Sequence, residues 1–184
     1  MTEATTIPGW VAGTWAIDPI HSEVGFSVRH LMLSKVRGRF ETFEGQIATT
    51  DDILATRANI TVDLNSINTG NADRDNDLRS ANYFEVDKYP TMTYRVLDLR
   101  ADGDRYVADG ELTVKEHTNP VPLEVEFHGI NKDPWGGTRA GLSVIGEINR
   151  KDFGITFDMP MEGGGLVVGD KIKIDLEIEA VLQQ

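Results

Sequence analysis

Apolar and polar residues alternate along most of the chain. Between residues 172 and 180, every second residue is Ile, Leu or Ala, and the residues between them are charged. A period of two is typical of a β-strand that has one inward side and one solvent-facing side. Residues 23–30 follow the same pattern, with one side formed by Val24, Phe26, Val28 and His30.

The pattern predicts a mainly β fold. About eight strand-like runs follow one another, joined mostly by tight turns such as Asp102-Gly103. One short helical segment is predicted near residues 71–82, where the alternation stops and Asn71 or Asp73 could cap a helix. An antiparallel barrel or a two-sheet sandwich accommodates such strands. We expect residues 1–12 to form a flexible tail and residues 13–184 to form a single domain.

Two places depart from regular alternation. The inward parity changes between Phe40 and Phe43, as a β-bulge would cause. Residues 149–169 have the composition of a loop, with three glycines at positions 163–165 near its centre.

Glycines inside the strand-like runs favour a closed barrel. They weaken a flat sheet but permit the bends that closure requires, and runs of about ten residues suit tilted barrel strands. The inward positions mix bulky residues with small ones such as Ala108, Gly110 and Ala140. An eight-stranded barrel is either filled by side chains or holds one small ligand. The pattern alone leaves these two alternatives open.

Composition excludes several functional classes. The 184 residues include no cysteine, which excludes disulfides, iron–sulfur clusters, thiolate zinc sites and cysteine nucleophiles. The formal net charge of −12 makes binding to nucleic acid or to an anionic membrane unfavourable for the surface as a whole. The N-terminal residues do not resemble a signal peptide, and no run approaches the ~20 apolar residues of a membrane span. We therefore expect a cytoplasmic protein.

The histidines and serines do not form a recognisable catalytic or metal motif. His21 and His30 have opposite parity, His117 lies in a predicted turn, and His128 is on a solvent-facing side. No HExxH or GxSxG sequence is present. We therefore predict no metal site and assign no catalytic residue.

Basic residues cluster in two places. Lys35, Arg37 and Arg39 share one side of a strand, either as an ordinary solvent-facing side or as a patch near the barrel mouth. Arg74 and Arg79 lie in the polar segment that we expect to cross one barrel end. A further cation, Arg150, is expected to form a structural ion pair with Asp152.

Six segments occur in the order found in one protein family. They are WAIDPIHSEVGFSVRH, GRFETFEG, TGNADRDNDLRSANYFEVDKYP, GELTV, NRKDFG and VGDKIKI. Through these segments the chain closely resembles the YceI-like family of lipocalin-like, polyisoprenoid-binding proteins. The resemblance covers roughly residues 13–182. It implies an eight-stranded antiparallel lipocalin-like barrel with a helical segment, a homodimeric assembly, and an apolar interior that takes a long isoprenoid chain.

The segment near the predicted helix departs from the family pattern. Asp77 occupies the position where the family usually has a histidine, in the sequence RDNDLRS. Residues 82–84 are NYF where DFF is common, and residues 116–121 are EHTNPV where the family turn usually reads xGxTKPV. The first two differences lie in the segment expected to cross the barrel end, so the head group that this chain prefers can differ from that of the family's ligands.

The patterns and the resemblance together predict a binding protein without enzymatic activity. The expected ligand is a long-chain isoprenoid, either a polyprenyl diphosphate or an isoprenoid quinone, or a similar amphiphile, and no cofactor is required. His30, Arg74 and Arg79 are the expected contacts of the polar head group. The expected lumen residues are Trp15, Phe26, Val28, Phe40, Tyr94, Tyr106, Leu112, Phe127, Leu142 and Val144.

Two alternatives stay open at the level of sequence. One is an enzyme acting on a lipid-like substrate, for which His30 is the only candidate acid or base. The other is a structural or partner-binding barrel with a filled core.

Overall fold

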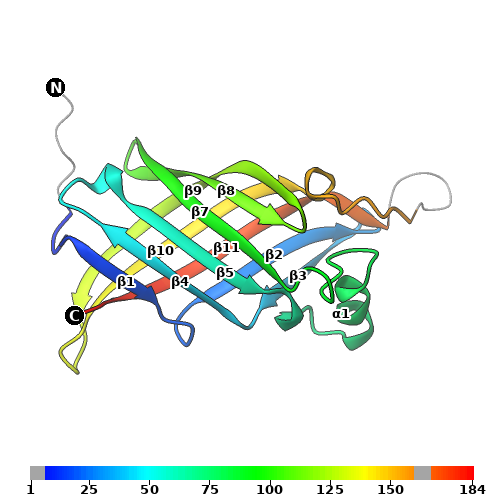
Figure 1. The fold of residues 1–184 in the computed structure, drawn as a ribbon, viewed down its shortest axis with the longest axis horizontal. Coiled ribbons are helices and arrows are strands. Elements are labelled where there is room, and N and C mark those ends of the chain that lie inside the picture. The colour runs from blue at the N-terminus through cyan, green and yellow to red at the C-terminus, as the bar shows by residue number, and fades with distance from the viewer. Residues whose placement is uncertain (1–6, 160–166) are drawn as a thin grey trace.

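A computed structural model describes residues 7–159 and 167–184, and within them the chain forms a barrel with one short α-helix (Figure 1). The strands are β1 (Gly13–Ile17), β2 (Glu23–His30), β3 (Ser34–Phe40), β4 (Phe43–Thr49), β5 (Arg57–Asp63), β6 (Ile67–Asn68), β7 (Thr91–Asp102), β8 (Arg105–Val114), β9 (His117–Lys132), β10 (Thr138–Asn149) and β11 (Val168–Leu182). The helix is α1 (Ala72–Arg79), and the 3-10 turns are η1 (Ile53–Ala55), η2 (Leu64–Ser66) and η3 (Arg150–Phe153).

The described strands combine into eight antiparallel barrel strands. β1 with β2, β3 with β4, and β5 with β6 are successive parts of single barrel strands, because β1 pairs with β4, β2 with β3, and β3 with β6. β11 closes the ring by pairing with β2 through its first part and with β1 through its last part. The predicted eight-stranded antiparallel barrel with one short helix is therefore confirmed.

The interruptions within the barrel strands have local causes. Pro19 lies between β1 and β2, and a proline has no N–H to donate to a neighbouring strand. Between β3 and β4 the chain leaves the ladder for two residues, whose amides hydrogen-bond to the carbonyl and hydroxyl oxygens of Ser66. This break allows both Phe40 and Phe43 to be buried, as the predicted change of parity requires.

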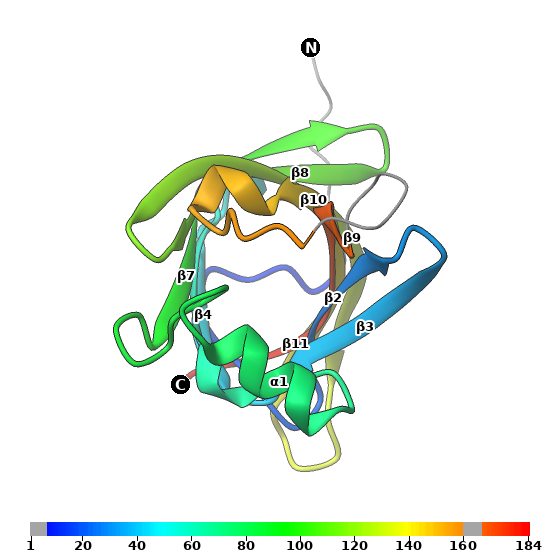
Figure 2. The same ribbon diagram turned by 90° about the vertical axis from the view of Figure 1, so that its right-hand side faces the viewer.

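Helix α1 lies across one end of the barrel (Figure 2). The side chain of Asn71 caps it by accepting a hydrogen bond from the amide of Arg74 at 2.9 Å. The helix is shorter than the predicted segment, since it ends at Arg79 rather than near residue 82. Within the described residues, no helix is long and apolar enough to cross a membrane.

The opposite end of the barrel is covered by residues that precede β1. Trp10 donates from its indole nitrogen to the carbonyl of Thr50 at 2.8 Å and packs edge-on against Phe127, with ring centroids 6.2 Å apart. Residues 7–12 thus lie against the barrel, although they form no strand. Residues 1–6 of the expected tail and the glycines at positions 163–165 lie outside the described residues.

The expected ion pair between Arg150 and Asp152 is wrong. Arg150 is buried, and its guanidinium instead pairs with Asp158 at 2.7 Å and with Asp170 at 3.3 Å. It also donates hydrogen bonds to the carbonyl oxygens of residues 155, 157 and 169. One side chain therefore fastens η3 and the segment after it to the start of β11.

Replacing Arg150 by methionine is expected to lower the free energy of unfolding by about 2–4 kcal/mol, because several carbonyls lose their donor and the carboxylates of Asp158 and Asp170 keep only Lys151 as a cationic partner. Arg100→Gln is the matched control. It breaks an exposed ion pair with Asp109 and is expected to leave the free energy of unfolding nearly unchanged. Urea unfolding of the two variants measures the difference, and equal losses would contradict the assigned role of Arg150.

Candidate functional site

Within the part of the chain that the structure describes, two cavities lie inside the barrel. The larger has a volume of ≈ 470 Å³ and lies toward the end that α1 crosses, between β2, β3, β8 and β11. The smaller has a volume of ≈ 160 Å³ and lies toward the opposite end, under Trp10 and Trp15. Close-packed protein interiors contain few voids larger than a water molecule. These volumes therefore mark space that the chain's own side chains leave empty.

All ten residues that alternation assigned to the lumen line one or both cavities. The register of the strands explains this agreement, because inward residues of neighbouring strands are paired side by side, as Phe26 is with Ile174 and Val144 is with Val125. The larger cavity is lined by Phe26, Val28, Phe40, Leu112 and Tyr94, and the smaller by Trp15, Tyr94, Tyr106, Phe127, Leu142 and Val144. Whether they contact a ligand stays a prediction.

Four residues line both cavities and form a waist between them. They are Ile60, Tyr94, Leu123 and Leu176, and they come from β5, β7, β9 and β11. Because these strands are spread around the ring, the four side chains narrow the lumen from several directions.

Tyr94 is held firmly in the waist. Its hydroxyl donates to the carbonyl of Val121 at 2.7 Å, and burial raises the pKa of its phenol. Its ring lies over Gly110, where a Cβ atom would stand 2.5 Å from the ring carbon Cζ. Gly110 is therefore required for this position of the ring, which links one strand-interior glycine directly to the shape of the lumen.

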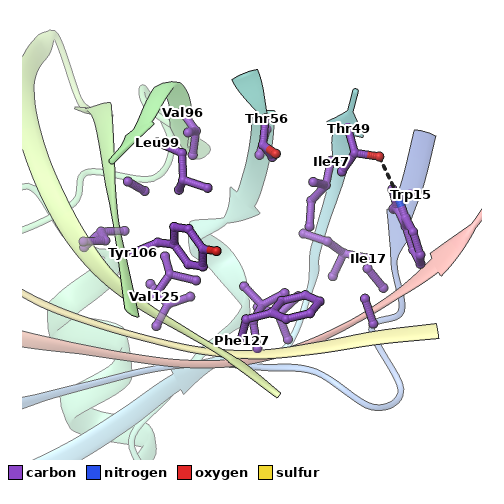
Figure 3. A pocket seen from close by; sticks show the side chains of 18 of the residues that line it. Trp15, Ile17, Ile47, Thr49, Thr56, Val96, Leu99, Tyr106, Val125 and Phe127 are labelled. Atoms are coloured by element: carbon purple, nitrogen blue, oxygen red, sulfur yellow. Dashed lines mark hydrogen bonds between the residues drawn. The ribbon is translucent and has the colours of Figure 1, made fainter. Parts of the chain in front are cut away.

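The smaller cavity is almost entirely apolar (Figure 3). The indole nitrogen of Trp15 donates to the hydroxyl of Thr49 at 3.0 Å, which satisfies the polar atom of the largest side chain there. The hydroxyl of Tyr106 is buried and has no hydrogen-bond partner among the described residues. It is thus a polar atom that a ligand or a water molecule could satisfy.

Polar side chains gather at the mouth of the larger cavity. His30 and Arg74, two of the three expected head-group residues, line it together with Arg29, Asp73 and Asp77. Arg74 is oriented by two hydrogen bonds, from Nε to the Thr69 hydroxyl at 2.7 Å and from Nη2 to the Thr69 carbonyl at 2.8 Å. The mouth thus offers both cations and carboxylates to a ligand.

Arg79, the third expected head-group residue, does not line the cavity. Its guanidinium donates to the carbonyl oxygens of Asn65 at 3.0 Å and Ile67 at 3.1 Å, beside a shallow surface depression. At 3.6 residues per turn, residues five positions apart on a helix point about 140° away from each other. Arg74 and Arg79 therefore cannot both face the mouth from α1.

A family model for the YceI-like domain matches residues 15–180. The chain belongs to the YceI-like family. A UPF0312 protein of Staphylococcus epidermidis is 35% identical over 164 residues, which is 88% of this chain and 94% of the relative. A UPF0312 protein of Photorhabdus laumondii is 38% identical over 140 residues, 76% of this chain and 73% of the relative.

Solved structures share the YceI-like fold. The YCEI protein of Campylobacter jejuni is 26% identical with a TM-score of 0.69, covering 100% of this chain and 97% of that one. A protein described as a polyisoprenoid binding domain from Saccharophagus degradans also has a TM-score of 0.69, with 18% identity, 94% of this chain and 100% of that chain covered. At that identity the second likeness shows the fold alone.

Several residues that line the larger cavity of this YceI-like barrel were missed by sequence reasoning. They lie outside the alternating strands, in the segments after α1 and around η3, and include Tyr83, Phe84, Phe153 and Ile155. The adjacent aromatic side chains of Tyr83 and Phe84, directly after a very polar stretch, were the signal that could have identified the first pair.

One cluster outside the lumen has the composition of a metal site. Ligand atoms of Asp18, His21 and Glu179 lie within 4.8 Å of one another beside the pairing of β1 with β11. Arg139 already supplies a cation to both carboxylates of this cluster, since its Nη1 lies 2.8 Å from Asp18 and 3.4 Å from Glu179. The hydrogen bond from His21 is the main cause that lowers the pKa of Asp18 to about 2, with Arg139 contributing against the opposing effect of burial. We assign the cluster a structural role.

Proposed function

We propose that this YceI-like barrel binds a long-chain isoprenoid, such as a polyprenyl diphosphate or an isoprenoid quinone, or a similar amphiphile, with the chain in the lumen and the head group at the mouth. The observation that carries the proposal is the lumen itself, an apolar space with charged side chains at its α1 end, whereas the residues that line the smaller cavity at the other end include no charged side chain. The description of the Saccharophagus degradans neighbour as a polyisoprenoid binding domain supports the same ligand class.

Burial of the chain supplies enough free energy for binding. Removing one methylene group from water contributes about 0.8 kcal/mol, so a five-carbon prenyl unit contributes up to about 4 kcal/mol. Association costs about 4–15 kcal/mol before any net affinity appears. A few buried prenyl units therefore suffice, and the head group can serve mainly to set the direction of entry.

The charges at the mouth favour a head group that carries little negative charge. Arg29 and Arg74 attract an anion, but Asp73 and Asp77 line the same cavity and repel it. Asp77 stands where the family usually has a histidine, so this mouth is more acidic than the family pattern. Of the two ligand types named above, the quinone fits these charges better than the diphosphate.

The two alternative functions have less support. A filled barrel would not leave a cavity of ≈ 470 Å³ in the lumen. An enzyme would need an oriented acid or base, and within residues 7–159 and 167–184 the ring of His30 forms no side-chain hydrogen bond. We therefore propose binding without catalysis.

The proposal is tested by extracting the purified protein with organic solvent and analysing the extract by mass spectrometry. The stripped protein is then titrated with an isoprenoid quinone and with a polyprenyl diphosphate of the same chain length. We expect a prenyl lipid in the extract, or saturable one-to-one binding of the added compounds, with the quinone bound more tightly. An empty extract together with no binding of either compound would refute the proposal.

The waist is expected to limit how long a chain the lumen accepts. Leu123→Ala should join the two cavities and increase the affinity for longer prenyl chains relative to shorter ones. Leu64→Ala is the matched control, because Leu64 is fully buried but lines neither cavity. Both variants should lose about 2–5 kcal/mol of stability. A change of chain-length preference that is equal in both variants, or absent from both, would show that the waist does not set the length.

A further inference from the structure

The turn between β2 and β3 places apolar side chains in solvent at considerable conformational cost. Leu33 N–H closes the turn by donating to the carbonyl of His30 at 3.0 Å, and the two central residues, Leu31 and Met32, have φ angles of 53° and 60°. Such a turn strongly prefers Asn-Gly, because ordinary side chains disfavour positive φ. Met32 and Leu33 are nevertheless 61% and 81% exposed. Neither the backbone geometry of the turn nor burial explains why apolar residues occupy these positions.

This turn projects from the barrel end that α1 crosses (Figure 2), and Arg29 and His30, which precede it, line the larger cavity. Leu31 N–H donates to the carbonyl of Val167 at 2.8 Å, and Val167 N–H donates to the carbonyl of Met159 at 3.0 Å. Met159 is itself 54% exposed, and it lines the larger cavity together with Val167 and His30. The exposed apolar surface of Met32, Leu33 and Met159, here called the apolar rim, is therefore continuous with the mouth.

The strands that carry the turn are basic although the chain as a whole is acidic. No Asp or Glu occurs between Glu23 and Glu41, whereas this interval includes four of the chain's 18 lysines and arginines. Arg29 lies directly opposite Lys35 in the pairing of β2 with β3, an arrangement that is unfavourable without an anion nearby.

The basic side extends onto the neighbouring strand. Arg37 lies opposite Ser27, which lies opposite Lys173 on β11. Among the described residues, no carboxylate forms an ion pair with Arg29, Lys35 or Arg37. Farther from the turn this side becomes acidic, because Lys173 lies opposite Glu147 and the depression that contains Lys35 and Arg37 is also lined by glutamates and Asp175. The charge that matches a negatively charged partner is therefore confined to the strand ends next to the apolar rim.

We propose that the β2–β3 turn docks the barrel on an anionic phospholipid bilayer. Met32 and Leu33 enter the interface, and Arg29, Lys35 and Arg37 lie at the level of the lipid phosphates. Apolar residues flanked by Lys and Arg are the combination that binds membrane interfaces. The mouth of the larger cavity then faces the bilayer, from which an amphiphile can enter the lumen without crossing water.

The net charge of −12 does not oppose this arrangement. At physiological ionic strength, exposed charges more than about 8 Å apart are largely screened from one another. The bilayer therefore interacts mainly with the basic surface at the turn. Asp73 and Asp77 at the mouth oppose this attraction, so the β2–β3 turn rather than α1 contacts the lipid phosphates. Docking requires no isoprenoid, so it is independent of the ligand proposed above.

The test is sedimentation of the full-length protein with vesicles that contain no isoprenoid. One set consists of phosphatidylcholine alone and the other of equal parts phosphatidylcholine and phosphatidylglycerol. We expect binding to the second set only, and we expect that binding to weaken as salt is added. Failure of the wild-type protein to bind either set would overturn the proposal.

Two variants separate the contribution of apolar insertion into the bilayer from that of the basic side chains. Leu31→Asn combined with Met32→Gly gives the turn its preferred residues, so it should raise the melting temperature while lowering vesicle binding at least about tenfold. Arg29→Gln, Lys35→Gln and Arg37→Gln combined should lower binding by about a hundredfold or more. Unchanged binding by either variant would contradict the proposal.

Trp135→Ser is the matched control. Trp135 is 85% exposed in the turn between β9 and β10, at the barrel end remote from the β2–β3 turn (Figure 1). Its loss should leave vesicle binding unchanged, and an equal loss of binding would show nonspecific adsorption. Light scattering of the same proteins measures their oligomeric state and tests the alternative that a second copy of this chain covers the apolar rim. If the turn variants dissociate a dimer and no protein binds vesicles, the apolar rim contacts a second copy of this chain.

Discussion

The pairing of β11 with both β1 and β2 is the constraint on which the rest of the molecule depends. It closes the ring, and closure leaves no free edge along the sheet where β11 meets these strands. Once the ring is closed, every second residue of eight barrel strands faces an enclosed space. An unpaired polar group there would lose its hydrogen bonds to water. The apolar lumen is therefore a direct consequence of closure rather than a separate feature of the sequence.

Closure also explains why the two ends of the barrel differ. At one end, Trp10 and Trp15 cover a small apolar cavity from residues next to and within the first strand. At the other end, the interrupted strands leave room for α1 and η3, and polar groups such as Arg74 can reach both solvent and lumen. Arg150 holds that end together, because it joins η3 to acceptors in two further segments, residues 155–158 and the start of β11. A ligand with an apolar chain and a polar head has one orientation that suits this asymmetry.

The barrel and its inward residues could be predicted because they depend on a local rule. Alternation fixes the side on which a residue such as Phe26 lies, whatever the rest of the chain does. The direction of Arg79 could not be fixed in this way, since it depends on the rotation of a helix with few apolar residues. The partners of Arg150 depend on segments that meet only after the ring closes. The waist, likewise, arises where Tyr94 crosses Gly110 from a neighbouring strand.

The central claim is that an isoprenoid chain lies inside the barrel with its head at the mouth beside α1. Its most direct test is an anomalous difference map from crystals grown with a prenyl quinone that carries bromine at the end of the chain remote from the head. The account predicts the bromine inside the lumen, nearer to Tyr94 than to His30. Bromine on the outer surface of the barrel, or beside His30 with the head group deeper inside, would contradict it.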